Sequence, residues 1–132
     1  MNSKWDKASQ DLIDLLEMVL IPYKHTKRKM FGSPSYFVNN NMFAGVHEDI
    51  IFLRLSEEDR EALLLEDLDA CHFDPLEGRP MREYMVITEN IYRDVNHLEK
   101  WISKSIKFAS SLPPKQPKKN TKKTLINPSN SK

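Results

Sequence analysis

Hydrophobic and polar residues alternate with the period of a helix near the start of the chain. Residues 4–20 place apolar side chains at i, i+3, i+4 and i+7, which predicts an amphipathic helix. The stripe consists of Leu12, Leu15, Leu16 and Val19, with Trp5 and Ala8 before them. Pro22 ends this helix at or before the preceding residue, because proline disfavours the α conformation there.

From residue 27 to residue 55 the pattern changes to short apolar runs separated by polar breaks, as in β-strands. Asn39–Asn41 and His47–Asp49 are two such breaks, and each predicts a hairpin turn. Gly32–Pro34 interrupts the first run and predicts a bulge or bend within one strand. The segment is therefore predicted to form three strands in an antiparallel meander.

The second half of the chain predicts two more helices around a strand. Ser56 with Asp59 three residues later predicts a capped helix start, and Ala62–Leu65 is its apolar face. Arg82–Ile87 follows a loop and predicts a strand. A last helix is predicted over residues 93–110, before Pro113. Its core stripe is Val95, Leu98, Trp101 or Ile102, Ser105 and Ala109, with Trp101 as the core anchor.

Strands clustered between flanking helices and joined by short connections favour an α+β fold. We predict two layers, an antiparallel sheet with the helices on one face, in the order helix, three strands, helix, one or two strands, helix. The alternative, a doubly wound parallel sheet, needs strands and helices that alternate regularly, and this chain lacks that pattern.

Charge divides the chain into two parts. Of the 132 residues, 39% are hydrophobic and 30% charged, which is typical of a folded domain. Residues 1–112 contain all 19 acidic residues and 14 Lys and Arg, for a net charge of −5, whereas residues 113–132 contain six lysines, four prolines and no acid. We predict one folded domain over residues 1–112 and a disordered tail over residues 113–132.

Several functional classes find no support in the sequence. There is no apolar run long enough to span a bilayer and no signal-peptide pattern at the start, so we predict a cytoplasmic protein without a membrane contact. The three glycines lie far apart, which excludes a phosphate-binding loop. The histidines and Cys71 lack metal-ligand spacing, so no catalytic, cofactor-binding or metal-binding residue is predicted.

A basic stretch lies between the first helix and the strands. Lys27, Arg28 and Lys29 are candidate nucleic-acid contacts. The tail adds Lys118, Lys119, Lys122 and Lys123 to these candidates. The alternative is an edge strand that its lysines protect from pairing with other strands.

Five segments together resemble the N-terminal domain of TfoX/Sxy proteins. They are Arg28–Gly32, Tyr36–Asn39, Met42–Val46, Phe52–Leu55 and Gly78–Tyr84. The resemblance covers about residues 10–110 and implies an α-β3-α-β2-α domain like that of secretion chaperones. It also implies a role in regulating competence genes, as a co-activator that works with a DNA-bound regulator, and it supplies no catalytic residue.

The leading interpretation is thus a non-enzymatic protein-interaction domain, in which Arg79 and Arg82 face a protein partner. A homodimer formed by pairing of strand edges is a further expectation. The alternatives are a nucleic-acid-associated protein that uses the basic stretch and tail, or a small enzyme. Because the body is acidic, DNA binding is expected to be weak or nonspecific.

Overall fold

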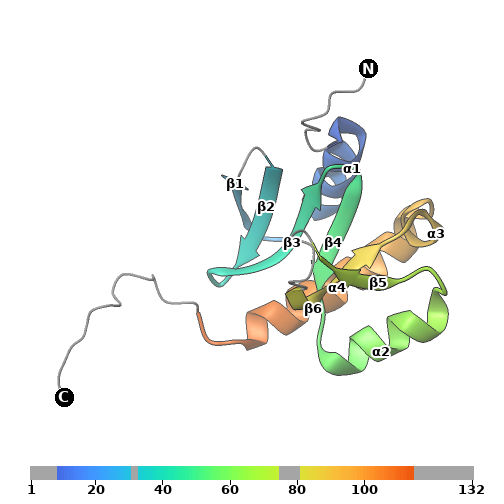
Figure 1. The fold of residues 1–132 in the computed structure, drawn as a ribbon. Coiled ribbons are helices and arrows are strands. Elements are labelled where there is room, and N and C mark those ends of the chain that lie inside the picture. Colours follow the sequence, from blue (N-terminus) through green and yellow to red (C-terminus); the bar gives the residue numbers. More distant parts are fainter. Residues whose placement is uncertain (1–8, 31–32, 75–80, 115–132) are drawn as a thin grey trace, which may run out of the picture.

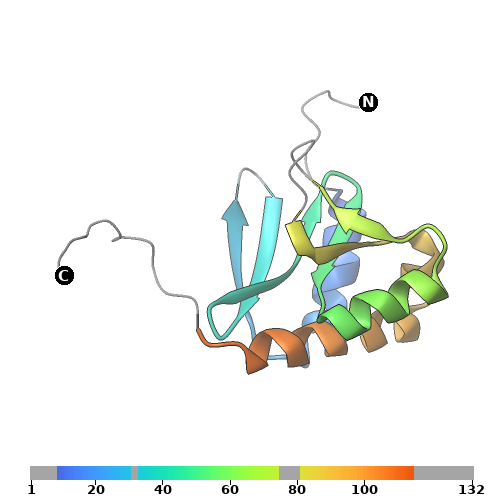
Figure 2. The same cartoon turned by 60° about the horizontal axis from the view of Figure 1, so that its bottom comes forward.

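The computed structural model describes residues 9–30, 33–74 and 81–114. Its elements are α1 (Gln10–Leu20), β1 (Thr26–Met30), β2 (Ser33–Val38), β3 (Asn41–His47), β4 (Ile50–Arg54), α2 (Glu57–Glu66), β5 (Cys71–Phe73), β6 (Met81–Ile87), α3 (Glu89–Tyr92) and α4 (Val95–Ser111). The strands form one six-stranded antiparallel sheet in the order β1-β2-β3-β4-β6-β5. The helices lie against one face of it (Figures 1 and 2), which confirms the predicted α+β class.

In the part of the chain that the structure describes, four strands precede α2, where the hydrophobic pattern predicted three. β1 and β2 pair as a hairpin with Met30 opposite Ser33, so the single bent strand that was predicted is two antiparallel strands. Glycine and proline are typical of both a bend and a reversal, and local composition does not separate the two. The helix predicted over residues 93–110 is confirmed as α4, which Asp94 caps, whereas the short helix α3 that precedes it was not predicted.

The two turns predicted from polar breaks are confirmed. Val38 pairs with Asn41, which leaves a two-residue turn with φ angles of 54° at Asn39 and 62° at Asn40. Positive φ at both central residues matches the right-handed twist of the strands, and asparagine tolerates that conformation. The second turn, between β3 and β4, has Glu48 at a φ of 54°.

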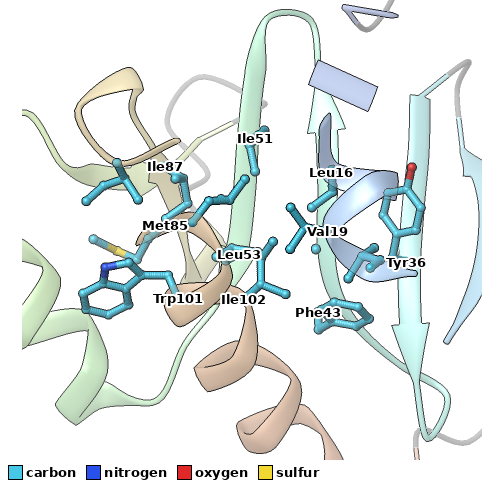
Figure 3. Packing of buried hydrophobic residues seen from close by; sticks show 14 of the residues in the cluster. Leu16, Val19, Tyr36, Phe43, Ile51, Leu53, Met85, Ile87, Trp101 and Ile102 are labelled. Carbon is cyan, nitrogen blue, oxygen red and sulfur yellow. The ribbon is translucent and has the colours of Figure 1, made fainter. Parts of the chain in front are cut away.

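The hydrophobic core lies between the helices and one face of the sheet (Figure 3). The strands contribute alternating residues, which include Tyr36, Ala44, Val46, Ile51, Leu53, Met85 and Ile87. The helices contribute Leu12, Leu16, Val19, Leu20, Leu63, Ile91, Leu98, Trp101, Ile102 and Ala109. Phe43 has no register partner at the irregularity between β2 and β3, so both it and Ala44 reach the core.

The side chains that cap the helices determine the residues at which α1 and α2 begin. The Ser9 hydroxyl accepts a hydrogen bond from the Leu12 amide, so α1 begins at Gln10, and the part of the predicted helix before Ser9, with Trp5 and Ala8, lies outside the described residues. The predicted cap of α2 is confirmed, since Ser56 Oγ accepts from the Asp59 amide at 3.1 Å. Within the described part of the chain, no helix has the length and apolar content that crossing a membrane requires.

Two predicted apolar faces are only partly buried. In α2, Leu63 is fully buried, but Leu65 is 86% exposed. Val95, predicted in the core stripe of the last helix, is 43% exposed because it is the first residue of α4 and lies beyond the edge of the core. Trp101, at 1% exposure, is confirmed as a core residue.

The β2–β3 turn also caps the C-terminal end of α4. Asn41, only 4% exposed, donates its side-chain amide to the carbonyls of Ala109 at 3.2 Å and Pro113 at 3.1 Å. Asn39 donates to the carbonyl of Leu112 at 3.1 Å. The Ala109 carbonyl also accepts from the Leu112 amide, and Leu112 and Pro113 follow the last residue of α4. The two asparagine side chains therefore add hydrogen bonds at this end of the helix and attach it to the sheet.

We expect replacement of Asn41 by alanine to lower the free energy of unfolding by about 1 kcal/mol, since hydrogen bonds of this kind contribute that much net stability. The Asn41→Asp variant should be less stable than the alanine variant, because a carboxylate cannot donate and meets the negative end of α4. Urea denaturation of both variants measures this, with the exposed Asn96→Ala as the control. An aspartate variant as stable as the alanine variant would contradict the capping role.

Candidate functional site

The three basic residues predicted to contact nucleic acid all lie on β1, at one outer edge of the sheet (Figure 1). Lys27, Arg28 and Lys29 are exposed. Neighbouring residues of a strand point to opposite faces of the sheet. Lys27 and Lys29 therefore lie on the face that the helices cover, and Arg28 lies on the opposite face, which we call the open face. The structure therefore brings them to one edge but divides them between its two faces.

Lys27 forms an ion pair with α1. Its Nζ lies 2.6 Å from Glu17 Oε2, and the same carboxylate accepts a hydrogen bond from the Tyr36 hydroxyl at 2.7 Å. The bonds from Lys27 and Tyr36 lower the pKa of Glu17 below its ordinary value. Burial and the bond to Glu17 raise the pKa of Tyr36, so this phenol stays protonated. Lys27 thus helps to hold the edge strand against α1.

Arg28 lies on the open face of the sheet. Its guanidinium carbon lies 4.2 Å from the centroid of the Phe37 ring, and Nη2 donates to Asn40 Oδ1 at 2.8 Å. A cavity of about 540 Å³ lies beside these residues. It is lined by Lys24, His25, Thr26, Arg28, Phe37, Val38, Asn39 and Asn40. The edge strand therefore borders a cavity whose lining combines the cations Lys24 and Arg28 with the apolar Phe37.

The predicted partner-facing pair is described only in part. Arg82 is exposed on β6 and lines a cavity of about 470 Å³ with Arg60, Met81, Glu83 and Tyr84. Arg79 lies outside the described residues, as do Lys118, Lys119, Lys122 and Lys123 of the tail. That Arg79 and Arg82 face a protein partner therefore stays a prediction.

A second cavity, of about 540 Å³, opens where the end of α4 meets the sheet. Its lining is mostly apolar and consists of Phe37, Asn41, Met42, Arg54, Met81, Tyr84, Leu112 and Pro113. Neither Arg54 nor Tyr84 was among the residues predicted to form a site. The sequence did carry a signal for Arg54, which is the charged residue of an otherwise apolar strand. A charged position in such a strand is expected on the face of the sheet that the helices do not cover.

The polar groups of this second cavity are engaged in structural contacts. Arg54 Nη2 lies 2.6 Å from Glu83 Oε1, and the Tyr84 hydroxyl donates to the Met42 carbonyl at 3.0 Å. Burial raises the pKa of Tyr84, which keeps the phenol a donor. These contacts tie β6 to β4 and β3. The polar groups of the cavity therefore stabilise the fold, and their arrangement is not one that transfers protons.

The middle of the open face is covered by aromatic side chains. Phe52 stacks on Phe73 with 4.2 Å between ring centroids, and Tyr84 meets the Phe52 ring edge-on at 5.8 Å. Phe37, Phe52 and Phe73 are each less than a tenth exposed. Rings that are already covered cannot act as stacking platforms for bases unless they move.

Acidic and metal-ligating side chains are dispersed over the structure. Among residues 9–30, 33–74 and 81–114, no group of three or more His, Cys, Asp or Glu could hold a metal ion. Acidic residues of α2 instead join it to α4, since Glu66 contacts His97 and Asp59 lies 3.8 Å from Lys104 Nζ. Cys71 is exposed on β5.

Comparison with protein families gives one result. The family model described as TfoX N-terminal domain matches residues 23–109, which include the whole sheet together with α2, α3 and most of α4. No curated protein matches the chain at a significant level. The family match covers well over half of the 132 residues. The chain therefore belongs to the TfoX N-terminal domain family.

Proposed function

We propose that this chain is a non-enzymatic protein-interaction domain that acts in the cytoplasm as a co-activator of competence-type gene expression, in contact with a DNA-bound regulator. The family match over residues 23–109 is the observation that carries this proposal. The arrangement of polar groups is consistent with it, because those of the cavity at the end of α4 hold the fold together through Arg54, Tyr84 and Asn41.

A nucleic-acid role through the basic stretch is the rival. The exposed Lys24, Arg28 and Lys29 favour it, since cations at a surface attract phosphates. Against it, Lys27 is paired with Glu17, and residues 1–112 have a net charge of −5 that repels a polyanion. A protein partner already bound to DNA requires no direct DNA contact from this chain.

Promoter recruitment in the native cell tests the proposal. An epitope-tagged full chain should occupy a defined set of promoters, and that occupancy should disappear when the co-occupying regulator is deleted. Deletion of this chain should lower the transcripts of those genes and leave the regulator bound. The purified chain should not select the same promoter DNA over unrelated duplex of equal length.

Two results would contradict the proposed function. One is unchanged transcription after deletion of the chain. The other is sequence-specific binding of promoter DNA by the purified chain alone, which would instead support the nucleic-acid role.

A further inference from the structure

β1 presents an open edge for strand addition. In the described part of the sheet it pairs with β2 alone, so its other side carries backbone amides and carbonyls directed away from the sheet. Residues Thr26 to Lys29 are all exposed. The opposite edge, β5, is only three residues long, so β1 is the longer template for an added strand.

Positive charge is concentrated along this edge. Lys24, Lys27, Arg28 and Lys29 occupy four of six consecutive positions and are exposed, and the Lys27 partner Glu17 is itself a surface group. On β1, Lys27 and Lys29 extend from one face and Arg28 from the other, so a segment lying alongside meets positive charge on either side. Lysines on an edge oppose pairing with neutral or basic strands, and by the same charge they select an acidic one.

Charge disfavours two other occupants of the β1 edge, namely β1 of a second copy and residues 113–132 of this chain. Antiparallel pairing of β1 with β1 of a second copy would bring Lys27, Arg28 and Lys29 against the same three cations, and like charges on opposed strands destabilise a sheet. Residues 113–132 contain six lysines and no acid, so this segment does not complement the edge. The homodimer expected from pairing of strand edges stays a prediction, and these charges disfavour it at β1.

We propose that β1 is the docking edge for an acidic, extended segment of the partner protein, which adds a seventh strand to the sheet beside Thr26–Met30. This inference rests on the proposed function and names the site and the chemistry of its partner. Backbone hydrogen bonds supply the pairing, and alternating acidic side chains face the cations. The cavity between Lys24, Arg28 and Phe37 receives a side chain of the segment.

A labelled ten-residue peptide of alternating Glu and Val is the probe, because its period of two places the acids on one face. Fluorescence anisotropy with the full chain should show tighter binding of this peptide than of the same peptide with Lys in place of Glu. Two further versions carry N-methyl groups on every second backbone amide, one on the Glu residues and one on the Val residues. One version should lose binding and the other should keep it, because an added strand directs only alternate amides to its neighbour.

Surface variants locate the binding. The Lys24→Glu and Lys29→Glu double variant should bind the Glu–Val peptide about tenfold more weakly, as expected for two reversed surface charges. The charge-matched control is Arg93→Glu with Lys107→Glu, two exposed residues outside β1, and it should leave affinity within about twofold. The tail is identical in all variants, so a difference between them reports on the edge. Amide exchange at residues 26–30 should slow when the peptide is bound.

Three results would overturn this inference. The first is equal binding by both N-methylated versions, which would show charge attraction without strand addition. The second is an equal loss in the two double variants. The third is a labelled 20-base-pair duplex that binds more tightly than the peptide and is weakened selectively by the edge variant, which would assign the edge to nucleic acid. If the peptide test fails but the chain is still recruited to promoters, the proposed function stands and only the docking edge is refuted. If the peptide binds as expected but deletion of the chain leaves transcription unchanged, only the proposed function is refuted.

Discussion

Replacement of Trp101 by alanine is expected to lower the free energy of unfolding by about 3–5 kcal/mol, the usual cost of removing a large buried aromatic side chain. Trp101 is 1% exposed and belongs to the cluster that joins α4 to the sheet (Figure 3). Its loss leaves a cavity among side chains that come from distant segments. Chemical denaturation of the full chain, followed by circular dichroism, measures the change.

Two companion variants sharpen this test. No described residue accepts a hydrogen bond from the indole Nε1 of Trp101. A Trp101→Phe variant removes that unpaired donor while it keeps a ring, so it should lose less than half as much stability as the alanine variant. Val95→Ala on the same helix, at an exposed position, should change stability by less than about 0.5 kcal/mol. A loss below about 1 kcal/mol in Trp101→Ala would contradict its role as a core anchor.

The second large effect is expected at Gly45, on the other face of the sheet. Gly45 pairs with Phe52 on the next strand, and the Phe52 ring lies across it, so an added Cβ would lie 2.8 Å from Phe52 Cε2 and closer still to Cζ. That ring is 4% exposed and stacked on Phe73. We expect Gly45→Val to cost about 3 kcal/mol, since relief of the clash requires the stack to break.

A double-mutant cycle distinguishes this clash from a loss of backbone flexibility. In a Phe52→Ala background the ring is absent, so Gly45→Val should cost much less than it does in the wild type. The coupling between the two changes, measured by urea denaturation, should exceed about 1 kcal/mol in the direction of relief. Strictly additive losses would show that the ring over Gly45 is not the reason for the glycine.

Short-range chemistry accounts for the features that the sequence predicted correctly. The Ser56 cap, the Asn39–Asn40 turn and the amphipathic stripe of α1 each depend on residues within a few positions of one another. The division of Lys27, Arg28 and Lys29 between the two faces of β1 likewise follows from the local geometry of a strand. The resemblance to TfoX N-terminal domains added the family, and the match over residues 23–109 confirms it.

Pairing between distant segments decided the rest. The reversal between β1 and β2 depends on which strand each run contacts, and β6 pairs with β4 although α2 and β5 come between them in the chain. Asn41 reads from the sequence as a turn residue, yet its amide caps a helix that ends about 70 positions later. The Phe52 ring lies over Gly45 and stacks on Phe73, and it meets both of these residues only once the strands have paired. Local pattern fixes the face that each side chain occupies, but only the assembled sheet determines which strand becomes the free edge, and thus where a partner can bind.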